Sequence, residues 1–214
     1  MNDTVEEKRA RLERLLAETQ RALGEEHPET LTAMLDLADS LWNQGRLIAA
    51  GKLEEQVVTT RRRILGEQHF DTLKATGKLA VTMAAQGDLI GARERQQEVV
   101  EGMRRLYGDN GLETLRAINN LAGTISAQGD LDAARELLES VVAATCREFG
   151  EPHPDSLAAM GNLAAVLWQQ RDRDEAYALQ QHVVDLRLNV SGDRDLATRA
   201  AVEVLEMMER DTGF

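Results

Sequence analysis

The sequence repeats itself with a fixed period of 42 residues. The segment Leu-Gly-Glu-Glu-His-Pro-Glu-Thr-Leu at residues 23–31 returns in related form at residues 65–73, 107–115 and 149–157, and a shortened copy begins at Ser191. Five glycines mark the period: Gly24, Gly66, Gly108, Gly150 and Gly192. A period of this size is typical of stacked repeats, in which neighbouring copies bury one continuous core. We therefore expect a repeat scaffold, whose usual task is binding.

Each period has room for two helices. In the third copy, residues 112–127 and 131–148 both carry apolar residues at helical spacing. The segment between them contains Gly129, which can adopt the left-handed conformation that ends a helix, and Asp130, which can cap the next one. We call the helix after the histidine-containing turn the first helix of a repeat, and the helix after the glutamine–glycine turn the second.

The packing positions recur in the same register. Each first helix carries a leucine–alanine pair, at Leu37-Ala38, Leu79-Ala80, Leu121-Ala122 and Leu163-Ala164. Each second helix carries one alanine and a pair of valines: Ala50 and Val57-Val58, Ala92 and Val99-Val100, Ala134 and Val141-Val142, Ala176 and Val183-Val184. Small residues at fixed sites allow two helices to cross closely, while the branched residues fill the space beside them.

The register predicts that the whole chain, residues 1–214, is a single domain made of full and half repeats. A leading half-repeat covers residues 4–22, full repeats cover 23–64, 65–106, 107–148 and 149–190, and a trailing half-repeat covers 191–210. This gives about ten helices and an all-α fold. The closing helix, residues 194–210, is more apolar than a terminal cap needs. A further helix, a longer parent protein or a homodimer through this helix would cover it.

Charge and cysteine content limit the function. The net charge of −12 disfavours binding to nucleic acids or anionic membranes, because both need a basic surface. The single cysteine, Cys146, excludes an intrachain disulfide and suits a reducing compartment. The charged N-terminus does not resemble a signal peptide, and no apolar run is long enough to span a membrane. These features predict a cytoplasmic protein.

No catalytic or cofactor motif stands out. His27, His69 and His153 form a series, but they occupy successive turns, and stacked repeats lie roughly 10 Å apart, too far to share one metal ion. We interpret them as residues that shape the turns. The sequence lacks a P-loop, a nucleophile elbow, HExxH and CxxC. We therefore expect a protein that is not an enzyme, with no cofactor and no metal.

Taken together, the Leu-Gly-x-x-His-Pro-x-Thr-Leu turn, the Asn119-Asn120-Leu121-Ala122 segment and the glutamine–glycine turn resemble the tetratricopeptide repeat, in the 42-residue variety of kinesin light chains. The resemblance covers roughly residues 5–208. It implies a right-handed superhelical solenoid of antiparallel helix pairs, in which first helices line a concave groove. It also implies that this groove binds a peptide or protein segment.

The same resemblance assigns groove positions on the first helices, and these positions lie opposite the leucine–alanine stripe. The candidate partner-binding residues are Thr32, Leu35, Asp39, Trp42, Asn43, Lys74, Lys78, Val81, Arg116, Asn119, Asn120, Asn162, Trp168 and Gln169. Kinesin light chains use asparagines of this kind to bind extended peptides, since an amide can donate and accept at once. The paired basic residues of tetratricopeptide carboxylate clamps are missing here.

Small residues, among them Gly77, Gly123 and Gly161, would leave a wide floor in the middle of the groove. Trp42 and Trp168 occupy the same repeat position three repeats apart. Either each tryptophan packs against its neighbouring repeat, or the two anchor a partner, as aromatic residues often do at binding hot spots.

Two functions therefore remain open. The first is a non-enzymatic adaptor that binds a peptide or protein segment, of unknown identity, in the concave groove. The second is a regulatory sensor whose solenoid binds a small molecule or signalling peptide and changes shape, with self-assembly as a further alternative.

Overall fold

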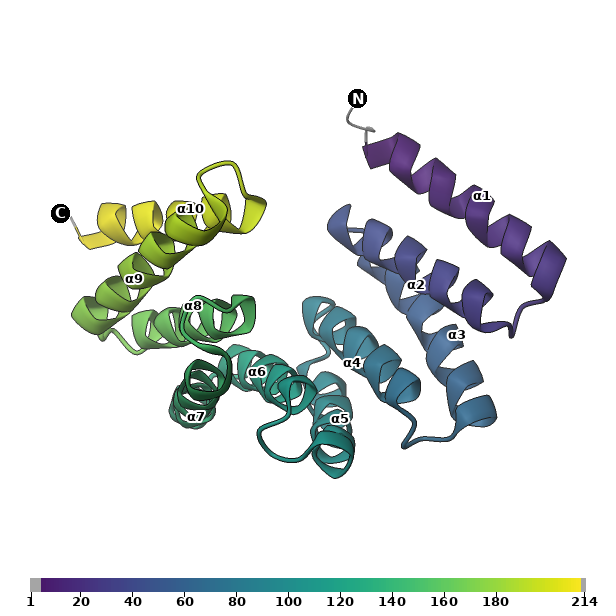
Figure 1. The fold of residues 1–214 in the computed structure, drawn as a ribbon, viewed down its shortest axis with the longest axis horizontal. Helices are drawn as coiled ribbons and strands as arrows, with labels where there is room; N and C mark the ends of the chain where they lie inside the picture. Colours follow the sequence, from purple (N-terminus) through teal and green to yellow (C-terminus); the bar gives the residue numbers. More distant parts are fainter. Residues whose placement is uncertain (1–4, 213–214) are drawn as a thin grey trace. The chain divides into compact units, whose positions relative to one another are not determined.

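The computed structural model describes residues 5–212, and these residues form ten α-helices with no strand among them (Figure 1). The helices are α1 (Val5–Leu23), α2 (Pro28–Asn43), α3 (Leu47–Leu65), α4 (Phe70–Ala85), α5 (Leu89–Tyr107), α6 (Leu112–Ala127), α7 (Leu131–Phe149), α8 (Pro154–Gln169), α9 (Arg173–Ser191) and α10 (Leu196–Thr212). The all-α prediction is confirmed. The expected helices at 112–127 and 131–148 match α6 and α7 to within one residue.

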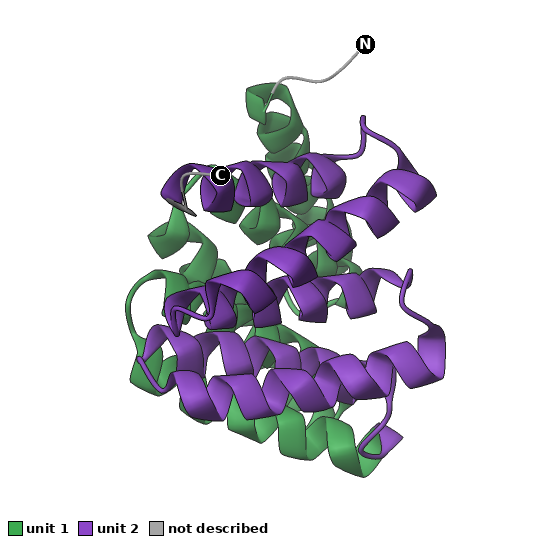
Figure 2. Cartoon of the chain, turned by 90° about the vertical axis from the view of Figure 1, so that its left-hand side faces the viewer, with its two compact units in different colours: residues 1–106 green, residues 107–214 purple. Residues whose placement is uncertain are grey.

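The chain forms two compact units, coloured separately in Figure 2. Unit 1 covers Met1–Leu106 and unit 2 covers Tyr107–Phe214. The boundary falls at the start of the third sequence repeat, so unit 1 holds the leading half-repeat and two full repeats. Unit 2 holds two full repeats and the trailing half-repeat. That residues 1–214 form a single continuous solenoid stays a prediction.

Within each unit, a helix packs against the helix that follows it in the chain, and small residues are fully buried between them. The alanine of each first helix and the alanine of each second helix are fully buried in all four repeats: Ala38 and Ala50, Ala80 and Ala92, Ala122 and Ala134, Ala164 and Ala176 are each 0% exposed. Because an alanine side chain ends at Cβ, two helix backbones can approach closely at these points. The valine pairs fill the adjacent space, and seven of the eight valines are buried.

The turns between first and second helices depend on a left-handed residue. Gly45, Gly87 and Gly129 have φ of 72°, 92° and 90°. The fourth repeat places Arg171 at the same point with φ of 69°, which a residue with a Cβ adopts at a cost. Asp130 caps α7 as expected, since its carboxylate accepts a hydrogen bond from the Ala133 N–H at 3.3 Å.

The closing helix is less apolar on its outside than its composition suggests. Ala201, Leu205 and Met208 are buried in unit 2, where Ala201 and Leu205 join the cluster of Met160, Val183 and Val184. Leu196, Val204 and Met207 remain exposed. None of the helices in the described part of the chain has the length and apolarity to cross a bilayer.

Candidate functional site

The turns that lead into the first helices fix where those helices begin. In three of them a histidine caps the helix: Nδ1 of His27, His69 and His153 accepts from the backbone N–H two residues later, at 3.3, 3.1 and 3.3 Å. A threonine or serine adds a second bond, as Thr30 donates to the Gly24 carbonyl and Ser156 to the Gly150 carbonyl, both at 2.8 Å. The expectation that these histidines shape the turns is confirmed, and Gly111 takes the cap position in the third repeat.

In unit 1, the exposed faces of α2 and α4 are joined by an ion pair. Nζ of Lys78 donates to both carboxylate oxygens of Asp39, at 2.5 and 2.6 Å. Thr32, Trp42 and Asn43 are exposed on the same helix as Asp39, and Trp42 is 40% exposed. The predicted residues of this unit therefore include two that satisfy each other's charge within the protein.

The other predicted residues of unit 1 differ in their surroundings. Leu35 is only 7% exposed, so its side chain belongs to the core rather than to an open surface. Val81 is half-buried. Lys74 is exposed, and its Nζ lies 5.8 Å from the centre of the Phe70 ring, within the range of a cation–π contact.

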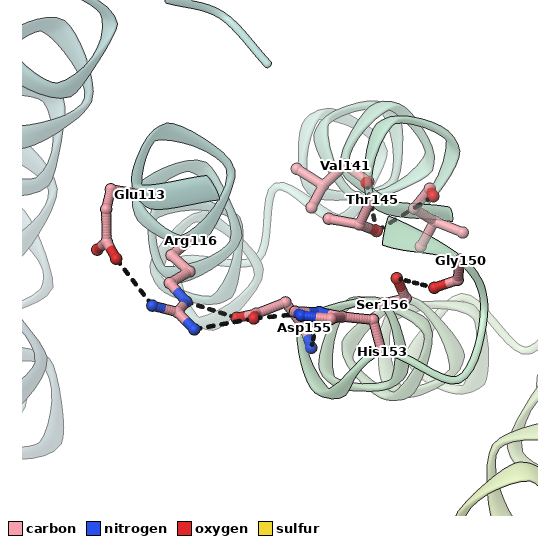
Figure 3. Close-up of polar contacts among 9 residues, drawn as sticks. Glu113, Arg116, Val141, Thr145, Gly150, His153, Asp155 and Ser156 are labelled. Carbon is pink, nitrogen blue, oxygen red and sulfur yellow. Dashed lines mark hydrogen bonds and ion pairs between the residues drawn. The ribbon is translucent and has the colours of Figure 1, made fainter. Parts of the chain in front are cut away.

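In unit 2, Arg116 of α6 links two carboxylates, those of Glu113 on its own helix and Asp155 on α8 (Figure 3). Nε and Nη2 of Arg116 donate to the two carboxylate oxygens of Asp155, at 2.6 and 2.9 Å, and Nη1 donates to Glu113 at 2.8 Å. The hydrogen bond to Asp155 raises the pKa of the Arg116 guanidinium above its ordinary value. Asp155 follows His153, whose Nδ1 accepts from the Asp155 N–H, so the helix-capping turn holds the arginine's partner in place.

Asparagines continue this polar strip from α6 to α8. Nδ2 of Asn162 donates to Oδ1 of Asn119 at 3.0 Å. Asn120 is exposed, and its amide has no hydrogen-bond partner among residues 5–212. A hollow of about 270 Å³ opens here, lined by Leu115, Arg116, Asn119, Asn120, Val141, Thr145, Asp155 and Ala158. Three of the predicted binding residues, all from α6, therefore meet at one hollow.

Gly123 on α6 and Gly161 on α8 leave open space above the rest of this exposed surface. A Cβ built at Gly123 or Gly161 meets nothing within 4 Å, so internal packing does not require glycine at either position. Larger side chains would fit at these two positions without disturbing the fold, and the single wide floor expected from the sequence stays a prediction.

The two tryptophans behave differently. The guanidinium carbon of Arg173 lies 3.6 Å from the centre of the Trp168 ring, so one face of this half-buried indole is covered within its own repeat. Its neighbour Gln169 is exposed. Trp42 is exposed and belongs to the other unit. The expectation that the two tryptophans hold one partner between them stays a prediction.

Sequence reasoning missed the pairing of these residues. Asp39 bonds to Lys78 and Arg116 bonds to Asp155, and both pairs are separated by 39 residues. A separation of 39 residues is three residues shorter than the 42-residue period. Each residue therefore contacts the next first helix about one helical turn before its own equivalent position. Opposite charges at this separation were present in the sequence and could have revealed both contacts.

The side chains that could bind a metal ion or react as nucleophiles do not form a site in the described part of the chain. Within residues 5–212, no three histidine, cysteine, aspartate or glutamate side chains lie close enough to hold a metal ion. Burial raises the pKa of the Cys146 thiol, which makes the reactive thiolate less available near neutral pH.

Comparison with known proteins assigns the family. A tetratricopeptide repeat model matches residues 71–147 and 113–189, and a second tetratricopeptide repeat model matches residues 30–71. The chain belongs to the tetratricopeptide repeat family. Tetratricopeptide repeat proteins are typically non-enzymatic interaction scaffolds, and this chain is a protein-interaction scaffold in that general sense. No curated protein matches the sequence significantly.

Solved structures agree with the assignment. A crystal structure of a candidate kinesin light chain from Podosopora anserina, with nearly identical TPR-like repeats, has 28% sequence identity over 88% of this chain and 89% of that chain, with a TM-score of 0.70. BtubC (BKLC) from P. vanneervenii is 17% identical and covers 99% of this chain and 85% of its own, with a TM-score of 0.75. PlcR of Bacillus thuringiensis is 12% identical over 92% of this chain and 69% of its own, with a TM-score of 0.65. The resemblance to kinesin light chain repeats is confirmed, and the last two matches show the shared fold.

Proposed function

We propose that this chain is a non-enzymatic adaptor that binds a peptide or protein segment along the exposed faces of its first helices. The observation that carries the proposal is the polar strip of α6 and α8, where Asn120 has a free amide at the edge of a hollow of about 270 Å³. An amide group can donate to and accept from one peptide unit at once. Arg116 and Asn119 are already bonded within unit 2, so they would position the strip and Asn120 would contact the partner.

The shape of the surface supports a chain-like ligand. Gly123 on α6 and Gly161 on α8 leave open space above the helices, and an extended peptide needs such a shallow floor. The same fold in PlcR has been crystallised with the peptide PapR7 and DNA. We extend only the peptide mode to this chain, since its net charge of −12 disfavours a phosphate backbone. A cytoplasmic location is part of the same proposal.

The test compares matched variants in affinity capture from the native host, followed by quantitative mass spectrometry. We expect Asn120→Ala combined with Gly123→Ala to reduce the recovery of a specific partner about threefold to tenfold, because one hydrogen bond and the floor are lost. Asn189→Ala is the control, since Asn189 is exposed on the second helix α9.

Both groove substitutions should leave the fold intact, because alanine is the stronger helix former at each position. A circular dichroism melt checks this before capture. Equal recovery of every partner by the groove variant and the control would contradict the proposal. If capture instead enriches a small molecule, detected after denaturing the complex, the sensor function would replace the adaptor.

A further inference from the structure

The joint between α1 and α2 in unit 1 copies the joint between α7 and α8 in unit 2 bond for bond. Oγ1 of Thr19 donates to the carbonyls of Leu15 and Leu16, at 3.1 and 3.0 Å. Oγ1 of Thr145 donates in the same way to the carbonyls of Val141 and Val142, at 2.8 and 3.2 Å (Figure 3). The turns that follow also match, because His27 and His153 both cap the next helix. The two joints therefore share the same local hydrogen bonds.

The two joints differ in what covers them. Val141 is 2% exposed, because α6 packs against α7 and α8 and its buried Leu115 lines the hollow beside Val141. Leu15 occupies the matching place on α1 and is 42% exposed. The other matching residues, Val57, Val99 and Val183, are 0%, 5% and 1% exposed. Among residues 5–106, no helix takes the place over α1 and α2 that α6 takes over α7 and α8.

A groove remains at this place. It has a volume of about 300 Å³, and its lining includes Leu15, Thr19, Glu29, Thr32, Ala33 and Asp36. The leucine and alanine form its apolar base, while Glu29 and Asp36 are exposed on its α2 side. We call these six residues the α1–α2 groove.

Unit 2 shows which contacts a helix makes at such a joint. Arg116 of α6 bonds to Asp155, which matches Glu29 in the groove. Asn119 of α6 bonds to Asn162, which matches Asp36. Because both matching groove residues are carboxylates, a helix docked here would gain an ion pair from a cation at each of these two positions.

Lys8 adds a third requirement. It is exposed at the place where α7 has Ala134, which is fully buried, as is Ala122 of the neighbouring helix α6. An acidic side chain opposite Lys8 would satisfy its charge. The full pattern on the docking helix is an apolar residue, an arginine directly after it, a basic residue four positions after the apolar one, and an acidic residue seven positions after it.

We propose that the α1–α2 groove is a docking site for a partner protein's amphipathic helix with this charge pattern. The groove belongs to unit 1, whereas the polar strip of α6 and α8 belongs to unit 2, and docking in the groove does not depend on the peptide binding proposed for that strip. It would let the chain hold two protein segments at once.

A second copy of this chain fits the groove less well. Its α10 would place Arg199, Ala200 and Glu203 where α6 has Leu115, Arg116 and Asn119. A charged arginine would then stand over Leu15, and Glu203 would face Asp36 with the same charge. Glu206 would suit Lys8, but the other two contacts are unfavourable, so we assign the groove to a different protein.

The probe is a synthetic peptide with the sequence of α6, 16 residues long, that carries Asn119→Lys and Ala122→Glu, has blocked ends and bears a fluorescent label. We expect it to bind the full chain in fluorescence anisotropy. Glu29→Gln and Asp36→Asn should each weaken binding about threefold, as expected for exposed ion pairs, and Leu15→Ser should weaken it further. Glu67→Gln and Asp174→Asn, which neutralise exposed carboxylates outside the groove, should leave the affinity unchanged.

A charge exchange gives the decisive comparison. Asp36→Lys should weaken the original peptide and strengthen a version with glutamate in place of the introduced lysine. The side chains of Glu29 and Asp36 are both exposed, so circular dichroism should show an unchanged fold for the variants at these positions. No binding to the wild-type chain, or an affinity that is indifferent to Glu29→Gln and Asp36→Asn, would overturn the proposal. A concentration-dependent dimer in sedimentation that Leu15→Ser abolishes would give the groove to a second copy and overturn it as well.

Discussion

Units 1 and 2 are built from the same repeat, but they place different polar groups at matching positions. Lys78 of α4 and Asn162 of α8 hold the same repeat position; the first bonds to the carboxylate of Asp39, the second to the amide of Asn119. The backbone and the buried alanines are alike in both units. The repeat therefore fixes where two first helices meet, and leaves the chemistry of the contact free to vary.

The difference extends to a buried position of the second helices. Gln180 in unit 2 is 3% exposed, and its Nε2 donates to the carbonyl of Ala201 at 2.8 Å. Glu54 in unit 1 holds the same repeat position at 2% exposed, and its Oε2 has no partner. Burial raises the pKa of this carboxyl, and a hydrogen bond from Thr82 opposes the shift in part. The first repeat, in unit 1, thus carries a buried acid where the fourth repeat, in unit 2, carries an amide; the second and third repeats have Gln96 and Leu138 at this position.

Exchanging these two side chains should give the largest effects. We expect Gln180→Glu to lower the free energy of unfolding by about 3 kcal/mol, because a carboxylate cannot donate to the Ala201 carbonyl and is costly to bury. Glu54→Gln should raise it by about 1–2 kcal/mol near neutral pH. Urea denaturation measures both, and Glu94→Gln, an exposed change on α5, is the control.

The effect of Glu54→Gln should depend on pH. A raised folded-state pKa means that the stabilising contribution of the protonated Glu54 is fully present below the unfolded-state pKa and is lost as pH rises through the folded-state pKa. The difference between wild type and Glu54→Gln should therefore be larger at about pH 8 than at about pH 4. A difference of equal size at both pH values would show that Glu54 does not titrate in this range.

A smaller effect should come from the turns. At the turns between a first and a second helix, unit 1 has left-handed glycine in both repeats, whereas unit 2 has Gly129 in one and Arg171 in the other. Arg171→Gly should raise the free energy of unfolding by about 1 kcal/mol, because it removes the steric cost of a left-handed arginine. Gly129→Arg should lower it by a similar amount. Thermal melts of the two variants check this, and shifts in the same direction would contradict it.

The smallest effect should distinguish the ion pair from the amide pair. The side chains of Asp39 and Lys78 are 49% and 32% exposed, so the pair is partly screened by solvent. We expect Asp39→Asn to cost about 0.5 kcal/mol at low salt and almost nothing at about 1 M salt. Asn162→Ala, which breaks the amide pair of unit 2, should have a cost that salt hardly changes. Denaturation at two salt concentrations provides the measurement.

Much of this architecture follows from the sequence because the period constrains every copy at once. The buried alanine pairs, the capping histidines and the ends of α6 and α7 were all readable from one repeat and transferable to the others. The contacts between repeats were harder to predict. Leu35 looked like a surface residue by register and is buried, since register gives the direction of a side chain but not the depth of its surroundings. Arg116 looked free for a partner, yet it is bonded to Asp155 one repeat away. Such pairs depend on side-chain reach across a helix interface, which a periodic pattern does not encode.

The cap hydrogen bonds also fix the tautomer of the three histidines that accept them. Because Nδ1 accepts the helix N–H, a neutral ring at His27, His69 or His153 must carry its hydrogen on Nε2. Each of these three turns therefore has a defined N–H donor on the opposite side of the ring, and a doubly protonated ring would have no acceptor left for the cap. Nitrogen-15 NMR spectra of the imidazoles would then report whether α2, α4 and α8 still begin at their histidines.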